Sequence, residues 1–429
     1  MAAQDQTARP RAGPKFVALV LVAFLGPLSI HLFIPVLPFV RQAFDVEAGE
    51  AQLAFSLALL SMAMATPIYG TLSDRYGRLP VMIGGIGLFT IGAAIAVLAS
   101  SMQALIAGRV IQGAGAACGM VLARAVARDI YGPDRLGQMI AYLTTALVLG
   151  PMIGPPLGGL LTDFFGWQAN LAVPAVFGII AIIVAMTLIG ETKPAGLYPP
   201  ANVMRGYWYL MTNPRFLYFS LNQAIASGAF FALNAAAVYF MVETLGRPAT
   251  EFGLYFMLGP IGYMVGTFLA GRLSGRFSGA VHIIFGSIVS LLGSLTLPAL
   301  IAALGITPLS LFVPSLILSF GQGFSNPHAQ AAAIAVDDTL TGTASGIVVF
   351  LYLAVVAAMT QLVTLSQAGS LTLLVVMMVS SGVIALGLGV GIGYRELEFN
   401  EFQRKLSHRP SLVEEGIEVP KGTKKYPVQ

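Results

Sequence analysis

The sequence predicts an all-α membrane protein that crosses the bilayer many times. Hydrophobic residues make up 56% of its 429 residues and charged residues only 10%, whereas a soluble protein carries about 25% charged residues. The mean hydropathy of +0.81 agrees with this. Because so few charges cannot cover a water-facing surface, most of the chain is expected to lie in lipid.

Apolar runs of about 20 residues, the length of a spanning helix, recur twelve times. They cover roughly residues 16–40, 51–72, 80–99, 104–127, 136–162, 169–189, 215–241, 252–271, 280–303, 309–335, 344–366 and 371–393. The first run is too long for the core of a signal peptide. The longest connection, 190–214, is rich in proline and predicts a linker between two six-helix bundles, 16–189 and 215–393, with terminal tails 1–15 and 394–429.

Lysine and arginine gather on one side of these spans. If the N-terminus is cytoplasmic, 20 of the 23 basic residues lie in cytoplasmic segments. Only Arg41 and Arg247 fall on the other side, and Arg109 lies inside a span. The positive-inside rule therefore predicts that both termini, the linker and the C-terminal tail are cytoplasmic.

The same residue counts exclude several function classes. Cys118 is the single cysteine, so no intrachain disulfide or cysteine-rich metal site is expected. No HExxH pair and no intramembrane pair of aspartates is present, which disfavours an intramembrane enzyme and predicts no metal and no cofactor. The basic residues flank apolar segments, so lipid and not nucleic acid is the expected partner. A sensor or receptor without transport stays open.

An internal repeat supports the division into two halves. The chain reads Gly70-Thr-Leu-Ser-Asp-Arg-Tyr-Gly-Arg-Leu-Pro80 after the second span, and Gly271-Arg-Leu-Ser-Gly-Arg-Phe277 after the eighth. Two six-helix halves related by a parallel repeat are the plan of a major facilitator transporter, whose substrate site lies between the halves near the bilayer midplane.

Four motifs make the chain resemble the major facilitator superfamily over nearly all twelve helices. Residues 70–80 fit the loop motif GxLxDRxGRxP, residues 109–117 resemble RxxQGxGAA, and residues 150–159 resemble the GPxxGPxxGG motif of proton-driven antiporters. Residues 26–38 resemble helix 1 of the bicyclomycin and chloramphenicol resistance branch (Bcr/CflA). The resemblance implies a monomeric transporter of the bacterial inner (plasma) membrane that exports small amphipathic organic compounds in exchange for protons.

Two ionisable residues are candidates for the substrate and proton pathway. Arg109 is the only charge firmly inside a span, where it costs about 2.5 kcal/mol or more, and Gln112 shares its helix face. Arg109 either lines the cavity or bonds backbone carbonyls and organises packing. His31 stands where the resembled branch has an aspartate, and no acid lies in the middle of any span. Because histidine titrates near pH 6.5, His31 is a candidate proton carrier, a neutral cavity group or a packing residue.

Polar residues in the seventh and tenth spans complete the predicted pathway. These are Asn222, Gln223, Asn234 and Tyr239 with Phe230 and Phe231 between them, and Asn326, His328 and Gln330. Amides and aromatics around a cavity suit amphipathic organic molecules, although amides also join helices to each other. Pro327 frees a backbone carbonyl, which we expect Asn326 or Gln330 to satisfy.

Two further groups of residues are expected to control conformation. In the resembled family the 70–80 loop clasps the two halves, and Asp74 is expected to meet Arg124 or the helix N-terminus near residues 341–345. The loop group is Gly70, Asp74, Arg75, Gly77, Arg78 and Arg124. The glycines of the fifth span leave one face bare for a close neighbour, expected to be Gly259-Pro260. That group is Gly150, Pro151, Gly154, Pro155, Gly158 and Gly159, and it serves as a seal or pivot or only as packing.

The sequence leaves two transport hypotheses. The first is a proton-coupled exporter of small amphipathic compounds that works by alternating access. The alternative is a transporter of an anionic or polar metabolite, bound in a cavity formed by Arg109, His31 and His328.

Overall fold

A computed structural model gives the backbone of residues 13–193, 203–337, 340–365 and 371–408. Side chains are described for most of these residues, with the exception of 14, 132–138, 140–142, 144–148, 203, 204 and 392–408. Within these ranges the chain is helical and contains no strand. The predicted all-α membrane fold is confirmed.

The first half of the chain is built from six α-helices and two short irregular turns. They are α1 (Pro14–Phe33), the 3₁₀ turn η1 (Ile34–Val36), α2 (Leu37–Phe44), α3 (Ala48–Tyr76), α4 (Arg78–Val97), α5 (Met102–Phe165), α6 (Ala169–Val184) and the π-helical turn η2 (Ala185–Ile189).

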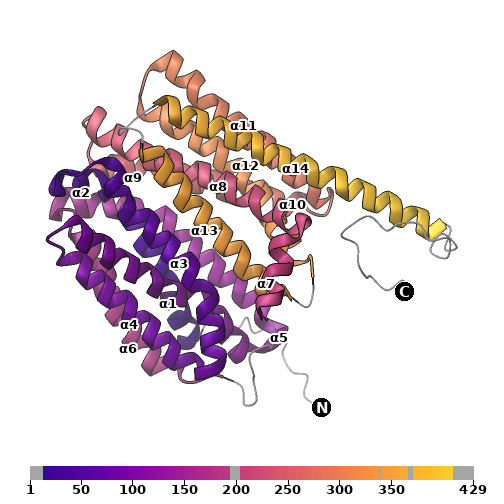
Figure 1. The fold of residues 1–429 in the computed structure, drawn as a ribbon, viewed down its shortest axis with the longest axis horizontal. Coiled ribbons are helices and arrows are strands. Elements are labelled where there is room, and N and C mark those ends of the chain that lie inside the picture. Colours follow the sequence, from indigo (N-terminus) through magenta and orange to yellow (C-terminus); the bar gives the residue numbers. More distant parts are fainter. Residues whose placement is uncertain (1–12, 194–202, 338–339, 366–370, 409–429) are drawn as a thin grey trace, which may run out of the picture.

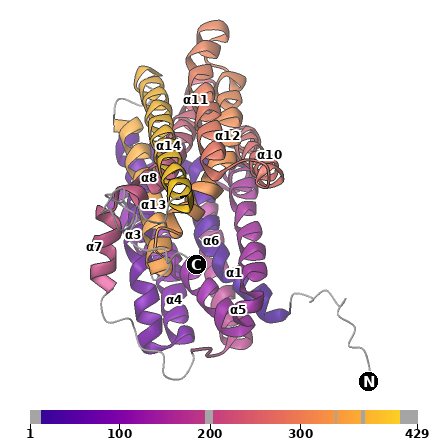
Figure 2. The same cartoon turned by 90° about the vertical axis from the view of Figure 1, so that its right-hand side faces the viewer.

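The second half contains α7 (Val203–Thr212), α8 (Pro214–Tyr239), the π-helical turn η3 (Phe240–Thr244), α9 (Ala249–Phe256), α10 (Leu258–Leu273), α11 (Gly279–Leu304), α12 (Pro308–Ile334), α13 (Thr341–Leu365) and α14 (Leu371–His408). Figures 1 and 2 show the two halves side by side, with α1 to α6 in one group and α8 to α14 in the other.

Helix α5 contains two of the predicted spans. Its 64 residues would reach about 96 Å as a straight helix, yet Gly119 lies against Val22 of α1 and Gly150 lies against Pro27 of the same helix. The chain therefore reverses inside α5. Eleven helical segments of the described residues are long and apolar enough to span a membrane. The twelfth predicted span, 136–162, is the second part of α5, where many side chains lie outside the description.

Prolines interrupt two spans at positions that matter for the site. Pro35 has no N–H to offer the carbonyl of His31, and the chain there passes through η1 before it continues as α2. Pro260 likewise leaves the carbonyl of Phe256 without its helical donor, and α9 ends at Phe256. His31 therefore lies at the broken end of its helix.

Two helical segments lie outside the predicted membrane spans. The predicted linker 190–214 contains a helix, α7, whose Trp208 is 74% exposed. The last helix, α14, continues past the predicted span 371–393 to His408, and Figure 1 shows it extending past its neighbours. Hydrophobicity marks where a helix is in lipid and does not mark where it stops, because a polar segment can also be helical.

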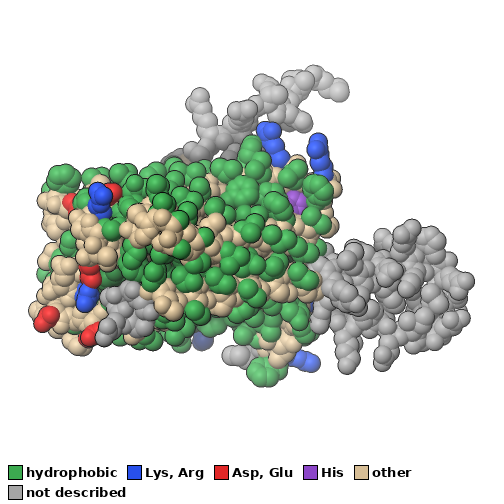
Figure 3. Space-filling model, turned by 90° about the horizontal axis from the view of Figure 1, so that it is seen from above, with side chains coloured by type: hydrophobic (Ala, Val, Ile, Leu, Met, Phe, Trp, Pro, Cys, Tyr) green, Lys and Arg blue, Asp and Glu red, His purple; other side chains and the backbone are tan. Residues whose placement is uncertain are grey.

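Charged side chains gather at the two ends of the molecule, with a hydrophobic band between them (Figure 3). We call the end that holds Arg75, Arg78, Lys193, Arg272 and Arg276 the basic face. The end that holds Arg41, Asp163, Glu243 and Arg247 is the opposite face. This layout is that of a protein whose middle lies in lipid.

Candidate functional site

A cavity of about 320 Å³ lies between the two halves. Helices α1, α3 and α5 line it from the first half, and α8, α10, α12 and α13 from the second. Its residues are Pro27, Ile30, His31, Leu59, Met62, Met120, Arg124, Pro151, Gln223, Ser227, Phe230, Phe231, Gly259, Pro260, Tyr263, Ser319, Gln322, Asn326, Gln330, Val349, Tyr352, Leu353 and Val356. None of these lining residues is an aspartate or a glutamate.

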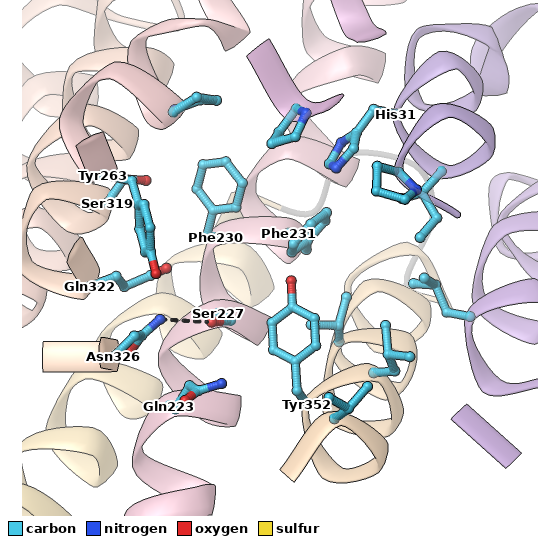
Figure 4. Close-up of a pocket in the computed structure, with 18 of the residues that line it drawn as sticks. His31, Gln223, Ser227, Phe230, Phe231, Tyr263, Ser319, Gln322, Asn326 and Tyr352 are labelled. Carbon is cyan, nitrogen blue, oxygen red and sulfur yellow. Dashed lines mark hydrogen bonds between the residues drawn. The ribbon is translucent and has the colours of Figure 1, made fainter. Parts of the chain in front are cut away.

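The polar groups of the cavity are mainly on the second half. Asn326 Nδ2 donates to Ser227 Oγ at 3.4 Å, and Gln322 Nε2 donates to the carbonyl of Ala226 at 2.7 Å. In Figure 4 the Tyr352 hydroxyl points into the cavity toward Phe231, and Gln223 lies at the same end as Asn326. The cavity thus offers amide and hydroxyl groups beside aromatic rings, the composition of a site for amphipathic molecules.

His31 is the cavity residue that carries a titratable imidazole from the first half. It is 6% exposed, and its ring stacks on Phe231 with centroids 6.0 Å apart and lies edge-on to Phe256 at 6.3 Å. Its Nδ1 atom has no hydrogen-bond partner among the described residues. Both aromatic rings belong to the second half, so His31 lies at the contact between the halves.

Arg109 is not among the cavity residues. It is buried inside the first half, where Nη1 donates to Ser29 Oγ at 2.9 Å and to Gln112 Oε1 at 2.7 Å. Its other donors reach the carbonyls of Ser29 and Ala54, and its guanidinium lies 4.2 Å from the Phe33 ring centroid. The structure therefore differs from the prediction that Arg109 and Gln112 line the pathway, because neutral acceptors of the bundle take up the donors of Arg109.

The amides of α8 and α12 divide between the cavity and the packing. Gln223 and Gln330 line the cavity with Asn326 and Phe230. Asn222 instead joins three helices, because its Nδ2 donates to Ser287 Oγ at 3.1 Å and to the Ala385 carbonyl at 2.7 Å. Asn234 donates to the carbonyl of Phe230 in its own helix. Tyr239 is buried near the opposite face, and neither it nor Asn234 is a cavity residue.

His328 also lies away from the cavity. Its ring stacks on His282 of α11 with centroids 4.1 Å apart, and its Nε2 lies 3.4 Å from Ser274 Oγ. The carbonyl freed by Pro327 is that of Gly323, and it accepts from Thr267 Oγ1 at 3.1 Å. The expectation that Asn326 or Gln330 satisfies it was wrong, since a neighbouring helix supplies the donor.

The glycine motif of α5 has a different neighbour from the one predicted. A side chain on Gly150, Gly154 or Gly158 would overlap Pro27, His31 or Leu32 of α1. On the other half, a side chain on Gly159 would overlap the backbone of Ala249, and Gly253 packs equally closely on Pro155. The face of Gly150, Gly154 and Gly158 therefore packs on α1, and Gly159 packs on α9. Gly259-Pro260 are not the facing element and line the cavity together with Pro151.

The loop motif forms its contacts within the first half. Arg78 Nη1 donates to Asp74 Oδ1 at 2.6 Å, and Arg78 Nε donates to Asp129 Oδ2 at 3.0 Å. Asp74 therefore pairs with Arg78, and neither Arg124 nor the start of α13 is its partner. Gly70 has open space beside it, while Arg75 lies over the Tyr76 ring.

Gly77 and Glu191 fix the start of α4. Gly77 has a φ of 104°, which L side chains rarely adopt. Glu191 then caps the helix by accepting from the backbone N–H groups of Arg78 at 2.9 Å and Leu79 at 3.2 Å. Partial burial raises the pKa of Glu191, but the backbone donors of Lys193, Arg78, Leu79 and Thr192 outweigh it, so that the pKa lies below its ordinary value.

Arg124 was predicted to belong to the cytoplasmic loop group, but it lines the cavity. The sequence also did not single out Ser227, Ser319 and Gln322 as site residues, nor the phenols Tyr263 and Tyr352. A partial signal existed for Tyr263, because it follows Gly259-Pro260, which the sequence did single out, by one helical turn. No comparable sequence signal marks Tyr352, which lies in the apolar stretch 347–359 of α13.

The halves are joined at the opposite face. Asp163 accepts from the backbone N–H of Ala249 at 3.1 Å and Thr250 at 2.8 Å, and from the Thr250 hydroxyl at 2.6 Å. Arg41 pairs with Glu243 at 2.5 Å. Gln361 of α13 accepts from Ser56 of α3 at 2.6 Å and donates to the Gly49 carbonyl at 2.8 Å. These contacts join residues of the first half to residues of the second half at the opposite face.

The sequence resembles bacterial drug-resistance proteins over most of its length. Multidrug resistance protein D of Escherichia coli is 28% identical over 84% of this chain and 91% of its own length. A bicyclomycin resistance protein homolog of Haemophilus influenzae is 24% identical over 81% of this chain and 88% of its own. Multidrug resistance protein MdtL of Shigella dysenteriae is 38% identical over 42% of this chain and 45% of its own.

Solved transporters share the fold. A D-xylose-proton symporter superimposes with a TM-score of 0.72 at 13% identity, over 87% of this chain and 96% of its own. A bacterial homolog of the lysosomal transporter Spinster gives 0.64 at 17% identity, over 88% and 94%. The family model for the Major Facilitator Superfamily matches residues 19–360. The chain therefore belongs to the Major Facilitator Superfamily and is a membrane transporter.

Proposed function

We propose that this transporter exports drug-like amphipathic organic compounds in exchange for protons by alternating access. The single observation that carries the proposal is the cavity between the halves. Its volume of about 320 Å³ is at the lower end of the range for small-molecule sites. The names of the similar bacterial proteins, which are multidrug and bicyclomycin resistance proteins, support the same substrate class.

His31 is the proposed proton carrier. It shares the cavity with the substrate, its Nδ1 has no described partner, and the lining residues include no carboxylate. An imidazole titrates in the physiological range when it is hydrated. Arg109 acts indirectly in this proposal, because its bonds to Ser29 fix the helical turn that precedes His31.

The proposed membrane is the inner membrane of a bacterium, with the basic face in the cytoplasm. The positive-inside rule supports this orientation, and the hydrogen bonds at the opposite face then make the described conformation closed to the outside. Residues 16–189 and 215–393 are the proposed rocking units, connected by residues 190–214. A cavity lined from both halves of one chain supports a monomer as the working unit.

The metabolite alternative is less well supported. It required Arg109, His31 and His328 around one cavity, but only His31 of these three is a cavity residue. The drug-resistance relatives also favour the first hypothesis.

The test combines resistance and transport. Expression in a bacterial strain that lacks its own exporters should raise the inhibitory concentration of at least one compound in a panel of neutral, anionic and cationic drugs. In proteoliposomes that contain a pH-sensitive dye, adding that compound should move protons, and His31→Ala should abolish this movement. Lack of resistance to every compound contradicts the proposed export, and unchanged proton movement in His31→Ala contradicts the role of His31.

A further inference from the structure

We propose that Arg124 is a substrate-binding residue that makes the cavity select organic anions, and neutral compounds with a strong acceptor group, over organic cations. This inference rests on the proposed function, because it names the substrate class of the same cavity. It concerns a residue that the sequence motifs assign to the loop group and that the structure places in the cavity wall.

The helical register places Arg124 at the basic end of the cavity. Helix α5 runs toward the basic face over residues 102–131, and Met120 lines the cavity one turn before Arg124. Gln223 lies in the first half of α8 and Gln330 lies near the end of α12, and the start of α8 and the end of α12 face the same side. His31, Phe230 and Ser319 lie deeper, toward the opposite face. The cavity therefore has a cationic, amide-lined end and an aromatic end.

Among the residues that the structure describes, Arg124 has no hydrogen-bond or ion-pair partner. Other arginines do have such partners. Arg78 has two carboxylates, Arg41 has Glu243, and Arg109 donates to four acceptors. Arg124 is only partly exposed, so water compensates its charge incompletely. A guanidinium in this position gains most from an acceptor that arrives with the substrate.

The charge of the wall determines which substrates are disfavoured. Arg124 and His31 are the lining residues that can be cationic, and the lining residues include no aspartate or glutamate. An organic cation would therefore meet one or two like charges and no counter-charge in a site of reduced dielectric. A protonated His31 strengthens this preference and cannot reverse it.

The shape of the guanidinium also specifies the favoured chemical groups. Its planar fork of donors matches carboxylate, sulfonate and nitro groups with two parallel hydrogen bonds. Gln223 and Gln330 at the same end can accept or donate toward the remainder of such a group. The aromatic body of the molecule would then contact Phe230, Phe231 and Pro260, which line the deeper part.

The experiment measures the binding of two related dyes to the purified full-length transporter by fluorescence anisotropy at physiological salt. Fluorescein is an anion and rhodamine 123 is a cation on the same xanthene scaffold. One charge-assisted hydrogen-bonded contact is worth about tenfold to a hundredfold in affinity. We expect fluorescein to bind at least about tenfold more tightly than rhodamine 123.

The variants separate the role of Arg124 from a general change in charge. Arg124→Gln should weaken fluorescein binding by about tenfold or more and should not weaken rhodamine 123 binding, whereas Arg124→Lys should retain part of the preference. Arg128→Gln is the matched control, because Arg128 lies one turn further along α5 and is exposed. It should leave both affinities unchanged. Thermal unfolding of each variant establishes that it is folded, and Arg124→Lys keeps the charge if Arg124→Gln does not fold.

Several results would overturn the proposal. These are equal binding of the two dyes, no measurable binding of either dye, and an unchanged fluorescein affinity in folded Arg124→Gln. The results can distinguish a failure of the proposed anion preference from a failure of the proposed drug export. A fluorescein preference without export of any drug contradicts the proposed function alone, and drug export with equal dye affinities contradicts only this inference.

Discussion

Asp163 is expected to hold the opposite face closed. It is at the end of α5 in the first half, and its carboxylate accepts from two backbone N–H groups and one hydroxyl of residues 249 and 250 at the start of α9 in the second half. Asp163 thus acts as the N-terminal cap of a helix that belongs to the other half. Asp163→Ala removes these acceptors and leaves the glycine packing between α5 and α9 in place.

The size of the effect follows from the known strength of helix caps. Loss of an N-cap acceptor costs about 1 kcal/mol, and loss of a negative charge at a helix N-terminus costs about 0.3–1 kcal/mol at exposed sites. Asp163 is exposed, so these surface values apply without correction for burial. A total of about 1.5 kcal/mol corresponds to about a tenfold change in a two-state equilibrium. We therefore expect about a tenfold shift toward states in which the opposite face is open.

The assay is a distance measurement between spin labels on the two halves at this face. Labels at Gln42→Cys and Thr244→Cys, both exposed positions, are placed in a Cys118→Ala background. In Asp163→Ala the longer-distance population should grow. Glu251→Gln is the matched control, because Glu251 pairs with Arg247 inside its own half at 3.7 Å. If Asp163→Ala gives the same distances as the parent and the control, the assigned role of Asp163 is refuted.

Three further predictions concern the start of α4 and the core of the first half. Gly77→Ala should lower the unfolding temperature, because a φ of 104° with a ψ of 154° costs a residue with Cβ about 1–3 kcal/mol; an unchanged temperature would contradict this. Glu191 has a lowered pKa, so its stabilisation is complete above its ordinary pKa of 4.5 and is lost as the pH falls through the folded value. Thermal unfolding between pH 6 and 3.5 should therefore show a smaller acid loss in Glu191→Gln than in the parent, and parallel curves would refute the cap. Arg109→Gln should destabilise the protein by about 3 kcal/mol, because several buried acceptors lose their donors at about 1–3 kcal/mol each; normal stability with lost drug binding would instead place Arg109 in the pathway.

The sequence predicted the membrane fold and the family because these depend on local properties. Apolar run length determines the spans, and the motifs at residues 70–80 and 150–159 lie on the elements expected for them. The glycines of α5 were expected to accept a close neighbour, and they do, since side chains at Gly154 and Gly159 would overlap His31 and Ala249. Which neighbour they accept depends on how helices from both halves meet, and the prediction of Gly259-Pro260 was wrong.

The membership of the cavity could be predicted only in part. Position along a helix gives depth in the membrane, but the direction of a side chain around the helix depends on packing. Arg109 and Arg124 illustrate this difference: the deeper arginine satisfies its donors inside one bundle, and the one nearer the basic face lines the cavity. His328 similarly turns toward His282, although Gln330 on the same helix lines the cavity.

The most direct measurement is the protection by substrate of a cysteine placed in the cavity. Ser227→Cys in the Cys118→Ala background is allowed to react with a water-soluble maleimide, with and without a drug that the protein exports. Ser274→Cys, exposed on the basic face of the same half, is the control. If transported molecules bind between the halves, the drug slows the reaction at position 227 and leaves that at position 274 unchanged. Equal rates at position 227 with and without a saturating drug would contradict binding in this cavity.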